Sequence, residues 1–172
     1  MSDLYLIDSC IAPAPWDKND SLHVDARGFA DSVGESSMAI SVVTLAEIEC
    51  GLKSHSQMDQ ERKSIVRASM AQYTYVLDIT RHTADAYSEI KAKLIENHAP
   101  SGSKGKLKKK WVEDLCDLPT GRKLGIQEND IWIAAHAYER NLLLVTEDKH
   151  MLIMAKLKLN PSLRILRLSD TP

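Results

Sequence analysis

The chain of 172 residues has little of several features that mark specialised classes of protein. Its three cysteines, Cys10, Cys50 and Cys116, are too few and too scattered for a disulfide framework or a zinc site. No pair of histidines has metal-ligand spacing, and no internal repeat is visible. No apolar run approaches the roughly 20 residues that cross a bilayer, and no basic region followed by an apolar stretch opens the sequence. We therefore expect a cytoplasmic protein without membrane contact.

An excess of either charge is also absent. The net charge of −2 excludes a globally basic nucleic-acid binder but leaves room for a local basic patch. With 44% hydrophobic and 27% charged residues, the composition is that of a soluble globular protein with an adequate core. We predict one domain over residues 1–172, with irregular insertions near 11–25 and 99–127.

Short apolar runs alternate with segments of helical period, which favours a parallel sheet covered by helices on both faces. The predicted strands are 4–7, 38–43, 75–79, 142–145 and 163–168. The last carries Arg164 and Arg167, which is typical of an edge strand. Helices are predicted at 45–53 and 59–73, on the apolar stripes within 86–94 and 131–138, and at 149–160. The fold class is therefore a three-layer α/β/α domain with a central, mainly parallel sheet of about five strands.

Four acidic residues lie where strands give way to helices: Asp8, Glu47, Asp130 and Asp148. Ligands of open parallel sheets bind at the carboxyl ends of the strands, so four such carboxylates indicate one cluster. Converging carboxylates repel each other unless a divalent cation neutralises them. A cation of this kind polarises a phosphoryl oxygen and lowers the pKa of its water. The pattern predicts Mg²⁺- or Mn²⁺-assisted chemistry on phosphate, with Asp8 and Asp130 as direct ligands and Glu47 and Asp148 completing the acidic ring.

Each acid also has a structural explanation. The segment Thr44 to Glu47 matches a capping box, in which a threonine caps a helix and a glutamate bonds back to the cap amide. Asp130 and Asp148 could be first-turn acids that interact with the helix dipole, an effect of about 0.3 to 1 kcal/mol each. Asp8 fits this explanation least, because a carboxylate that follows four apolar strand residues needs a buried partner.

Other polar residues have structural explanations. We expect His136, in an alanine-rich helix, to be a packed, hydrogen-bonded core residue and not a base. Glu49 and Glu147 neighbour proposed site residues, and adjacent side chains point in different directions, so both are expected to face away.

The segment 99–127 is long for a connection inside a compact domain, and such loops are usually functional, partly helical or disordered. It carries a run of lysines followed by Trp111: Lys104, Lys106, Lys108, Lys109 and Lys110. A basic flap that contacts phosphates is one interpretation, and a solvated loop without a partner is the other. Trp111 could stack on an exposed base, although packing against the domain is the simpler role.

Four segments together resemble PIN-domain ribonucleases, and most closely the toxin subunits of VapBC toxin-antitoxin pairs. They occur in family order from the first strand to the last helix: residues 4–9, 40–51, 129–137 and 143–148. The resemblance implies the same four acidic site positions, with Thr146 as a neighbouring hydroxyl that contacts substrate. It also implies a homodimer, a small VapB-like antitoxin and a structured RNA substrate.

The sequence departs from the family pattern in the first motif, where Cys10 stands in place of the usual asparagine. The amide that could orient a metal-bound water is thereby lost. The proline-bearing stretch after Cys10 and the lysine insertion are further departures. They leave a non-catalytic PIN-like module that binds RNA or protein as the alternative. A phosphatase or phospho-acceptor domain is a third reading, but the phosphatase motif needs an aspartate at position 10.

Overall fold

The structure, a computed structural model, describes residues 4–99 and 111–171, and its centre is a sheet of five parallel strands. In spatial order the strands are β3 (Tyr75–Leu77), β2 (Met38–Ser41), β1 (Tyr5–Ile7), β4 (Leu143–Thr146) and β5 (Arg164–Arg167). All neighbouring pairs are parallel. The predicted all-parallel sheet is confirmed, and β5 is an edge strand as its two arginines indicated.

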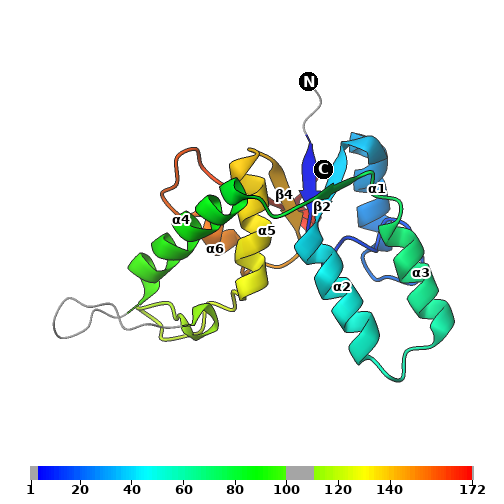
Figure 1. The fold of residues 1–172 in the computed structure, drawn as a ribbon, viewed down its shortest axis with the longest axis horizontal. Helices are drawn as coiled ribbons and strands as arrows, with labels where there is room; N and C mark the ends of the chain where they lie inside the picture. The colour runs from blue at the N-terminus through cyan, green and yellow to red at the C-terminus, as the bar shows by residue number, and fades with distance from the viewer. Residues whose placement is uncertain (1–3, 100–110, 172) are drawn as a thin grey trace.

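Two groups of helices cover the sheet (Figure 1). On one side lie α1 (His23–Val33), α2 (Val42–Ser54) and α3 (Gln60–Met70). On the other lie α4 (Arg81–His98), α5 (Glu128–Glu139) and α6 (Leu152–Ala155). Single 3₁₀ turns occupy Glu35–Ser37, Val112–Asp114 and Leu168–Asp170. The three-layer α/β/α architecture is therefore the one that the sequence predicted, and no described helix has the length and apolarity to cross a membrane.

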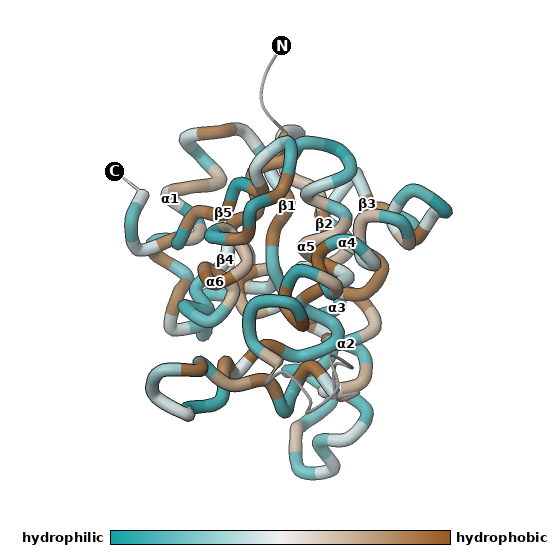
Figure 2. Tube along the Cα trace, turned by 90° about the vertical axis from the view of Figure 1, so that its left-hand side faces the viewer, coloured by the Kyte–Doolittle hydropathy of each residue, from teal (hydrophilic) through white to brown (hydrophobic). Residues whose placement is uncertain are grey.

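The core is divided by the alternation of side chains along each strand. In β1, Leu6 packs into the cluster that contains α4 and α5, whereas Ile7 packs into the cluster with α1. Ala39 and Ile40 of β2 divide in the same way, because successive strand residues point to opposite faces. Both faces are apolar, and hydrophobic segments gather on the central strands in Figure 2. A sheet buried on both faces explains the continuous apolar runs in the sequence.

The strand order places a topological switch between β1 and β4. The chain adds β2 and β3 on one side of β1, and later adds β4 and β5 on the other side. In open α/β sheets the crevice outside the carboxyl ends of the strands at such a switch is the usual ligand site. Asp8 follows β1 and Asp148 follows β4 by two residues, so both acids border this crevice.

Helix α2 begins earlier than predicted. The strand prediction 38–43 was two residues too long, because Ser41 ends β2 and caps α2 through a 2.9 Å hydrogen bond from the Val43 amide to Ser41 Oγ. Thr44 is therefore a buried residue inside the helix and not its cap, so the capping-box explanation of Glu47 is wrong. Glu47 lies in the second turn of α2, where it does not cap the helix.

The helix predicted at 149–160 is also wrong for most of its length. Only Leu152–Ala155 is α-helical, and the segment is held by hydrogen bonds between residues three apart, such as Met154 N to Met151 O at 3.0 Å. The buried residues Met151, Met154 and Leu157 are themselves spaced by three. That spacing suits 3₁₀-like turns, in which side chains three apart eclipse.

The two predicted insertions differ in kind. Residues 9–16 form tight turns and α1 starts at His23, so the irregular stretch ends slightly before residue 25. Tyr73 fixes this stretch by donating from its hydroxyl to Ala12 O at 2.9 Å and by an edge contact with Trp16. The buried carboxylate of Asp17 forms an ion pair with Arg62 of α3. In the second insertion, residues 111–127 contain a 3₁₀ turn and one antiparallel bridge between Cys116 and Lys123.

Candidate active site

Asp8 is a buried carboxylate with hydrogen-bond partners on both oxygens. Its side chain is 3% exposed, and its backbone amide donates to Val145 O at 3.0 Å, which continues the pairing of β1 with β4. Oδ1 accepts from the Ser9 amide at 2.7 Å, and Oδ2 accepts from the Thr146 hydroxyl at 2.7 Å. These bonds fix the carboxylate at the carboxyl end of the central strand. The interior partner expected for Asp8 is thus a neutral hydroxyl and not a basic side chain.

Thr146 links Asp8 to Asp148. Its hydroxyl oxygen accepts from the Asp148 amide at 2.9 Å while its proton goes to Asp8, so the end of β4 is tied to the end of β1. Asp148 Oδ1 accepts from the His150 amide at 2.8 Å, which closes a turn after the strand. The second oxygen of Asp148 makes no hydrogen bond within the described part of the chain and is open to a further ligand.

Glu47 reaches the site from α2 and meets α5. The Asn129 side-chain amide donates to Glu47 Oε1 at 3.1 Å. Glu47 Oε2 is buried and has no hydrogen-bond partner among residues 4–99 and 111–171. A buried acceptor without a donor is costly, so this oxygen is available to a water or cation. Asn129 was not singled out as a site residue, although its position immediately before Asp130 in the first turn of α5 could have indicated it.

Asp130 lies in the first turn of α5, and its pKa is raised to about 6. Burial is the main cause, and the charges of nearby carboxylates also raise the pKa: Asp8, Asp148 and Glu47. Its Oδ2 accepts from the Gln127 amide at 2.7 Å, which acts in the opposite direction. This bond across the first turn of α5 gives Asp130 a helix-capping role as well. Three of the predicted carboxylates therefore lie within electrostatic reach of the fourth, Asp130.

The donor set fits a hard divalent cation held partly through water. No three Asp, Glu, His or Cys side chains in the described part of the chain stand close enough to ligate one ion directly. Mg²⁺ usually keeps several waters and takes only one or two carboxylates, so such a site does not require tight clustering. The buried free oxygen of Glu47 and the electrostatic strain on Asp130 are two features that a cation would relieve.

Cys10 occupies the space beside Asp8. Its Sγ donates to Asp8 Oδ2 at 3.3 Å and accepts from the Glu147 amide at 3.4 Å. Burial, reinforced by the negative charge of Asp8, raises the pKa of Cys10 to about 12. The thiol is therefore neutral at physiological pH and is a weak donor, where a side-chain amide would supply both a donor and an acceptor.

The acidic neighbours of the site face elsewhere, as predicted. Glu49 of α2 forms an ion pair with Arg67 of α3, with Arg67 Nε 2.7 Å from its carboxylate. Glu147 pairs with Arg167 and accepts from the Ser169 amide at 3.0 Å. Each is matched by a positive charge, in contrast to the four acids of the site.

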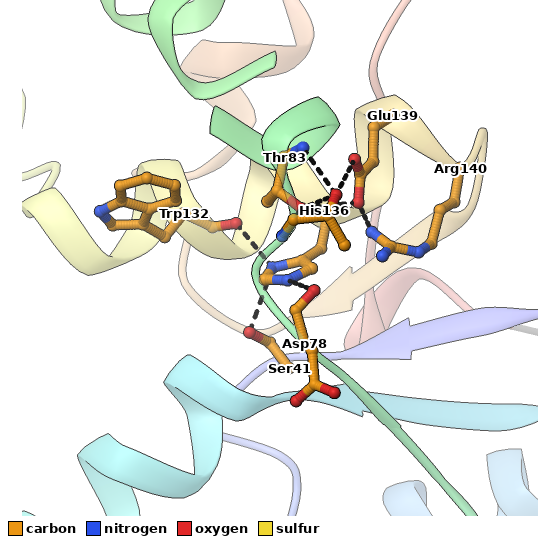
Figure 3. A network of polar contacts seen from close by, with 8 residues as sticks. Ser41, Asp78, Thr83, Trp132, His136, Glu139 and Arg140 are labelled. Atoms are coloured by element: carbon orange, nitrogen blue, oxygen red, sulfur yellow. Dashed lines mark hydrogen bonds and ion pairs between the residues drawn. The ribbon is translucent and has the colours of Figure 1, made fainter. Parts of the chain in front are cut away.

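His136 is a buried structural residue, as predicted, and it joins three elements behind the site (Figure 3). Ser41 Oγ lies 3.2 Å from Nδ1, and Nε2 lies 3.2 Å from Asp78 O. Nδ1 also lies 3.0 Å from the Trp132 carbonyl oxygen, so the ring is held among three oxygens, and burial lowers the pKa of His136. Because Ser41 caps α2, this network fixes the start of the helix that carries Glu47 relative to α5.

The predicted phosphate-binding lysines lie outside the described residues: Lys104, Lys106, Lys108, Lys109 and Lys110. Trp111, which follows them, has 74% of its surface exposed, so it does not pack against the domain as expected.

The chain belongs to the PIN domain family, whose model matches residues 5–157. The resemblance noted in the sequence is thereby confirmed. No curated protein matches the chain at a significant level.

Solved structures of toxin-antitoxin complexes share the fold. VapBC2 from Rickettsia felis, solved with a DNA fragment of its promoter, has 18% identity and a TM-score of 0.64, and the match covers 95% of this chain and 98% of that one. DNA-bound VapBC from Salmonella typhimurium has 20% identity and a TM-score of 0.63, with 96% and 98% covered. VapBC-5 from Mycobacterium tuberculosis, a member of that family of toxin-antitoxin systems, has 17% identity and a TM-score of 0.57, with 96% and 98% covered. At these identities the likeness concerns the fold.

Proposed function

We propose that this PIN-domain protein is a metal-dependent endoribonuclease that hydrolyses RNA phosphodiester bonds with Mg²⁺ or Mn²⁺. The observation that carries the proposal is a set of acidic side chains at the topological switch of the sheet, where burial and the charges of Asp8, Asp148 and Glu47 raise the pKa of Asp130. Structural ion pairs do not account for the raised pKa of Asp130, because the nearby ion-paired acids Glu49 and Glu147 lie outside the cluster. Perturbed acids in a crevice are typical of functional sites.

The residues of the site have different roles in the proposed reaction. Asp8 and Asp130 would hold the cation, while Asp148 and Glu47 hold or orient its waters through their free oxygens. The cation supplies a polarised phosphoryl oxygen and an acidified water when it is bound. Thr146 keeps Asp8 in place through its hydroxyl, and Asn129 keeps Glu47 in place across the gap between α2 and α5.

The direct test is RNA cleavage by purified protein with and without divalent cation. Wild-type protein should cleave a structured RNA in Mg²⁺ or Mn²⁺ and should stop in excess chelator. Glu49→Gln is a matched control, because it removes a carboxylate of α2 that faces Arg67, and its activity should equal that of the wild type. Cleavage that continues in chelator would contradict the proposal.

A toxin-antitoxin role accompanies the nuclease proposal. The similar folds of VapBC complexes support a toxin with a small VapB-like antitoxin that covers the acidic groove, a homodimeric state and a cytoplasmic location. Co-expression with a short neighbouring gene product should suppress both cleavage and growth inhibition.

The lysine run should provide the phosphate contacts that an acidic cluster lacks. Replacing all five of these lysines with glutamine is expected to weaken RNA binding and to reduce the salt slope by about 0.7 for each lost phosphate contact. The control variant replaces five other lysines: Lys18, Lys63, Lys93, Lys156 and Lys158. Unchanged affinity and slope in the first variant would show that the run does not contact RNA.

The alternative is a non-catalytic PIN-like module, and Cys10 is the residue that favours it. A protein that binds RNA at the same site but cleaves none in any divalent cation would establish this alternative.

A further inference from the structure

An open groove of about 660 Å³ lies between α2 and α5, beside the acidic cluster. Its walls are mainly apolar: Val42, Val43, Ala46 and Cys50 of α2, Ile79 after β3, and Trp132 of α5. Glu47 and Asn129 line its polar end, where they hydrogen-bond to each other. The volume lies within the range of about 300 to 1,000 Å³ that is usual for small-molecule sites. The groove therefore opens directly onto the proposed cleavage site.

Trp132 has a fixed orientation in this groove. Its ring stacks on Tyr87 of α4, with 4.0 Å between ring centroids and an angle of 15° between planes. Lys91 supports the pair by donating to the Tyr87 hydroxyl at 2.7 Å. In Figure 3 the indole points away from the buried His136 network. A rigid, partly exposed indole is preorganised for stacking and loses little entropy when a ligand binds.

Ile79 supplies an aliphatic wall of the groove. It is 47% exposed and lines the groove together with the partly exposed Trp132. A flat ring is the ligand shape that suits an aromatic platform with aliphatic walls. Nucleobases stack on aromatic side chains without requiring a particular base, because every base has an aromatic face. The Asn129 amide at the polar end carries both a donor and an acceptor for a base edge.

We propose that this groove is a nucleobase subsite that seats one RNA base next to the cleaved phosphate, with Trp132 as its stacking platform. The proposal rests on the ribonuclease function, because the acidic cluster at the polar end would hold the adjoining phosphate through its cation. The base in this subsite belongs to the nucleotide that flanks the cut. Trp132 and Asn129 are thus specificity residues.

The test measures both binding and cleavage with short single-stranded RNA. Trp132→Leu should weaken binding in chelator by about 10-fold and raise KM by a similar factor with little change in kcat, whereas Trp132→Phe should retain most of the affinity. Tyr75→Leu is the matched control, because Tyr75 is an exposed aromatic residue of β3 that does not line the groove. Ala46→Phe adds a large side chain to the groove from α2 and leaves Trp132 in place, and it should reproduce the loss if Trp132→Leu folds poorly.

RNA with one abasic nucleotide beside the cleaved bond separates the possible outcomes. With this RNA the difference between wild type and Trp132→Leu should disappear, because the base that stacks is missing. An undiminished difference, or equal binding of intact RNA by wild type, Trp132→Leu and Ala46→Phe, would overturn the subsite and would favour a protein segment as the occupant. Because binding is measured in chelator, the comparison of the three proteins on intact RNA does not depend on whether the wild type cleaves RNA.

Discussion

Replacing Asp8 with asparagine is expected to lower metal-dependent RNA cleavage by about 100-fold or more without unfolding the protein. The side chain keeps its shape, and its remaining carbonyl oxygen can still accept from the Ser9 amide. The negative charge that would hold the cation is lost. A cation contributes several kcal/mol to the stabilisation of transition-state charge, and each 1.36 kcal/mol corresponds to a tenfold change in rate.

Asp78→Asn is the control for this experiment. Asp78 follows β3 as Asp8 follows β1, but its side chain is exposed and its charge acts on Arg140. Its backbone carbonyl oxygen, which lies 3.2 Å from His136 Nε2, is unaffected by the substitution. Cleavage should therefore be unchanged. Equal cleavage by wild type and Asp8→Asn, in preparations that share a melting temperature, would assign the activity to a contaminant.

Replacing Asp130 with asparagine is expected to abolish cleavage and to stabilise the metal-free protein at the same time. In the folded protein the pKa of Asp130 is about 6, above its ordinary value of 3.8. Above pH 6 its charge therefore destabilises the fold. Asparagine removes the charge and can still accept the 2.7 Å hydrogen bond from the Gln127 amide. In chelator at pH 7 we expect the melting temperature of Asp130→Asn to exceed that of the wild type by about 2 to 4 °C. In a protein of this size, a shift of that order corresponds to a gain of about 1 kcal/mol in the free energy of unfolding.

The pH dependence of this gain has a definite sign. A carboxylate whose folded pKa is raised binds its proton more tightly in the folded state between about pH 4 and 6, so wild-type stability falls as pH rises through that window. The advantage of Asp130→Asn should therefore vanish near pH 4 and be complete above pH 6. A wild type that is as stable as Asp130→Asn at pH 7 in chelator would contradict the electrostatic strain.

The sheet was predictable because its central strands, β2, β1 and β4, are buried on both faces. The runs ending in Ile7 and Val145 are continuously apolar, and all five strands lie within two residues of their predicted bounds. The errors occurred where local signals compete. Thr44 and Glu47 have capping-box spacing, but Ser41 lies at the end of the strand and caps the helix first. Residues 149–160 were predicted to form one helix that ends before Pro161, whereas their buried residues are spaced by three and the chain forms short turns.

The site was predictable in its charged members and not in its neutral ones. An acid after an apolar strand is visible in sequence, because charge is rarely placed there without a reason. The contacts that organise the acids come from distant segments: Asn129 to Glu47 across 82 positions, and Thr146 to Asp8 across 138. The groove that ends at Glu47 depends on the packing of Trp132 against Tyr87, which no local pattern reveals.

The central claim is that the four carboxylates together bind divalent cation. The dependence of the melting temperature on added Mg²⁺ or Mn²⁺ tests this claim most directly. A cation that binds only the folded state adds about 2.7 kcal/mol at 100 times its Kd, which corresponds to about 5 to 10 °C here. The account predicts that Mg²⁺ or Mn²⁺ raises the wild-type melting temperature by this order, that Asp8→Asn abolishes the rise, and that Asp78→Asn retains it. A rise of equal size in wild type and Asp8→Asn, or no rise in the wild type, would contradict the claim.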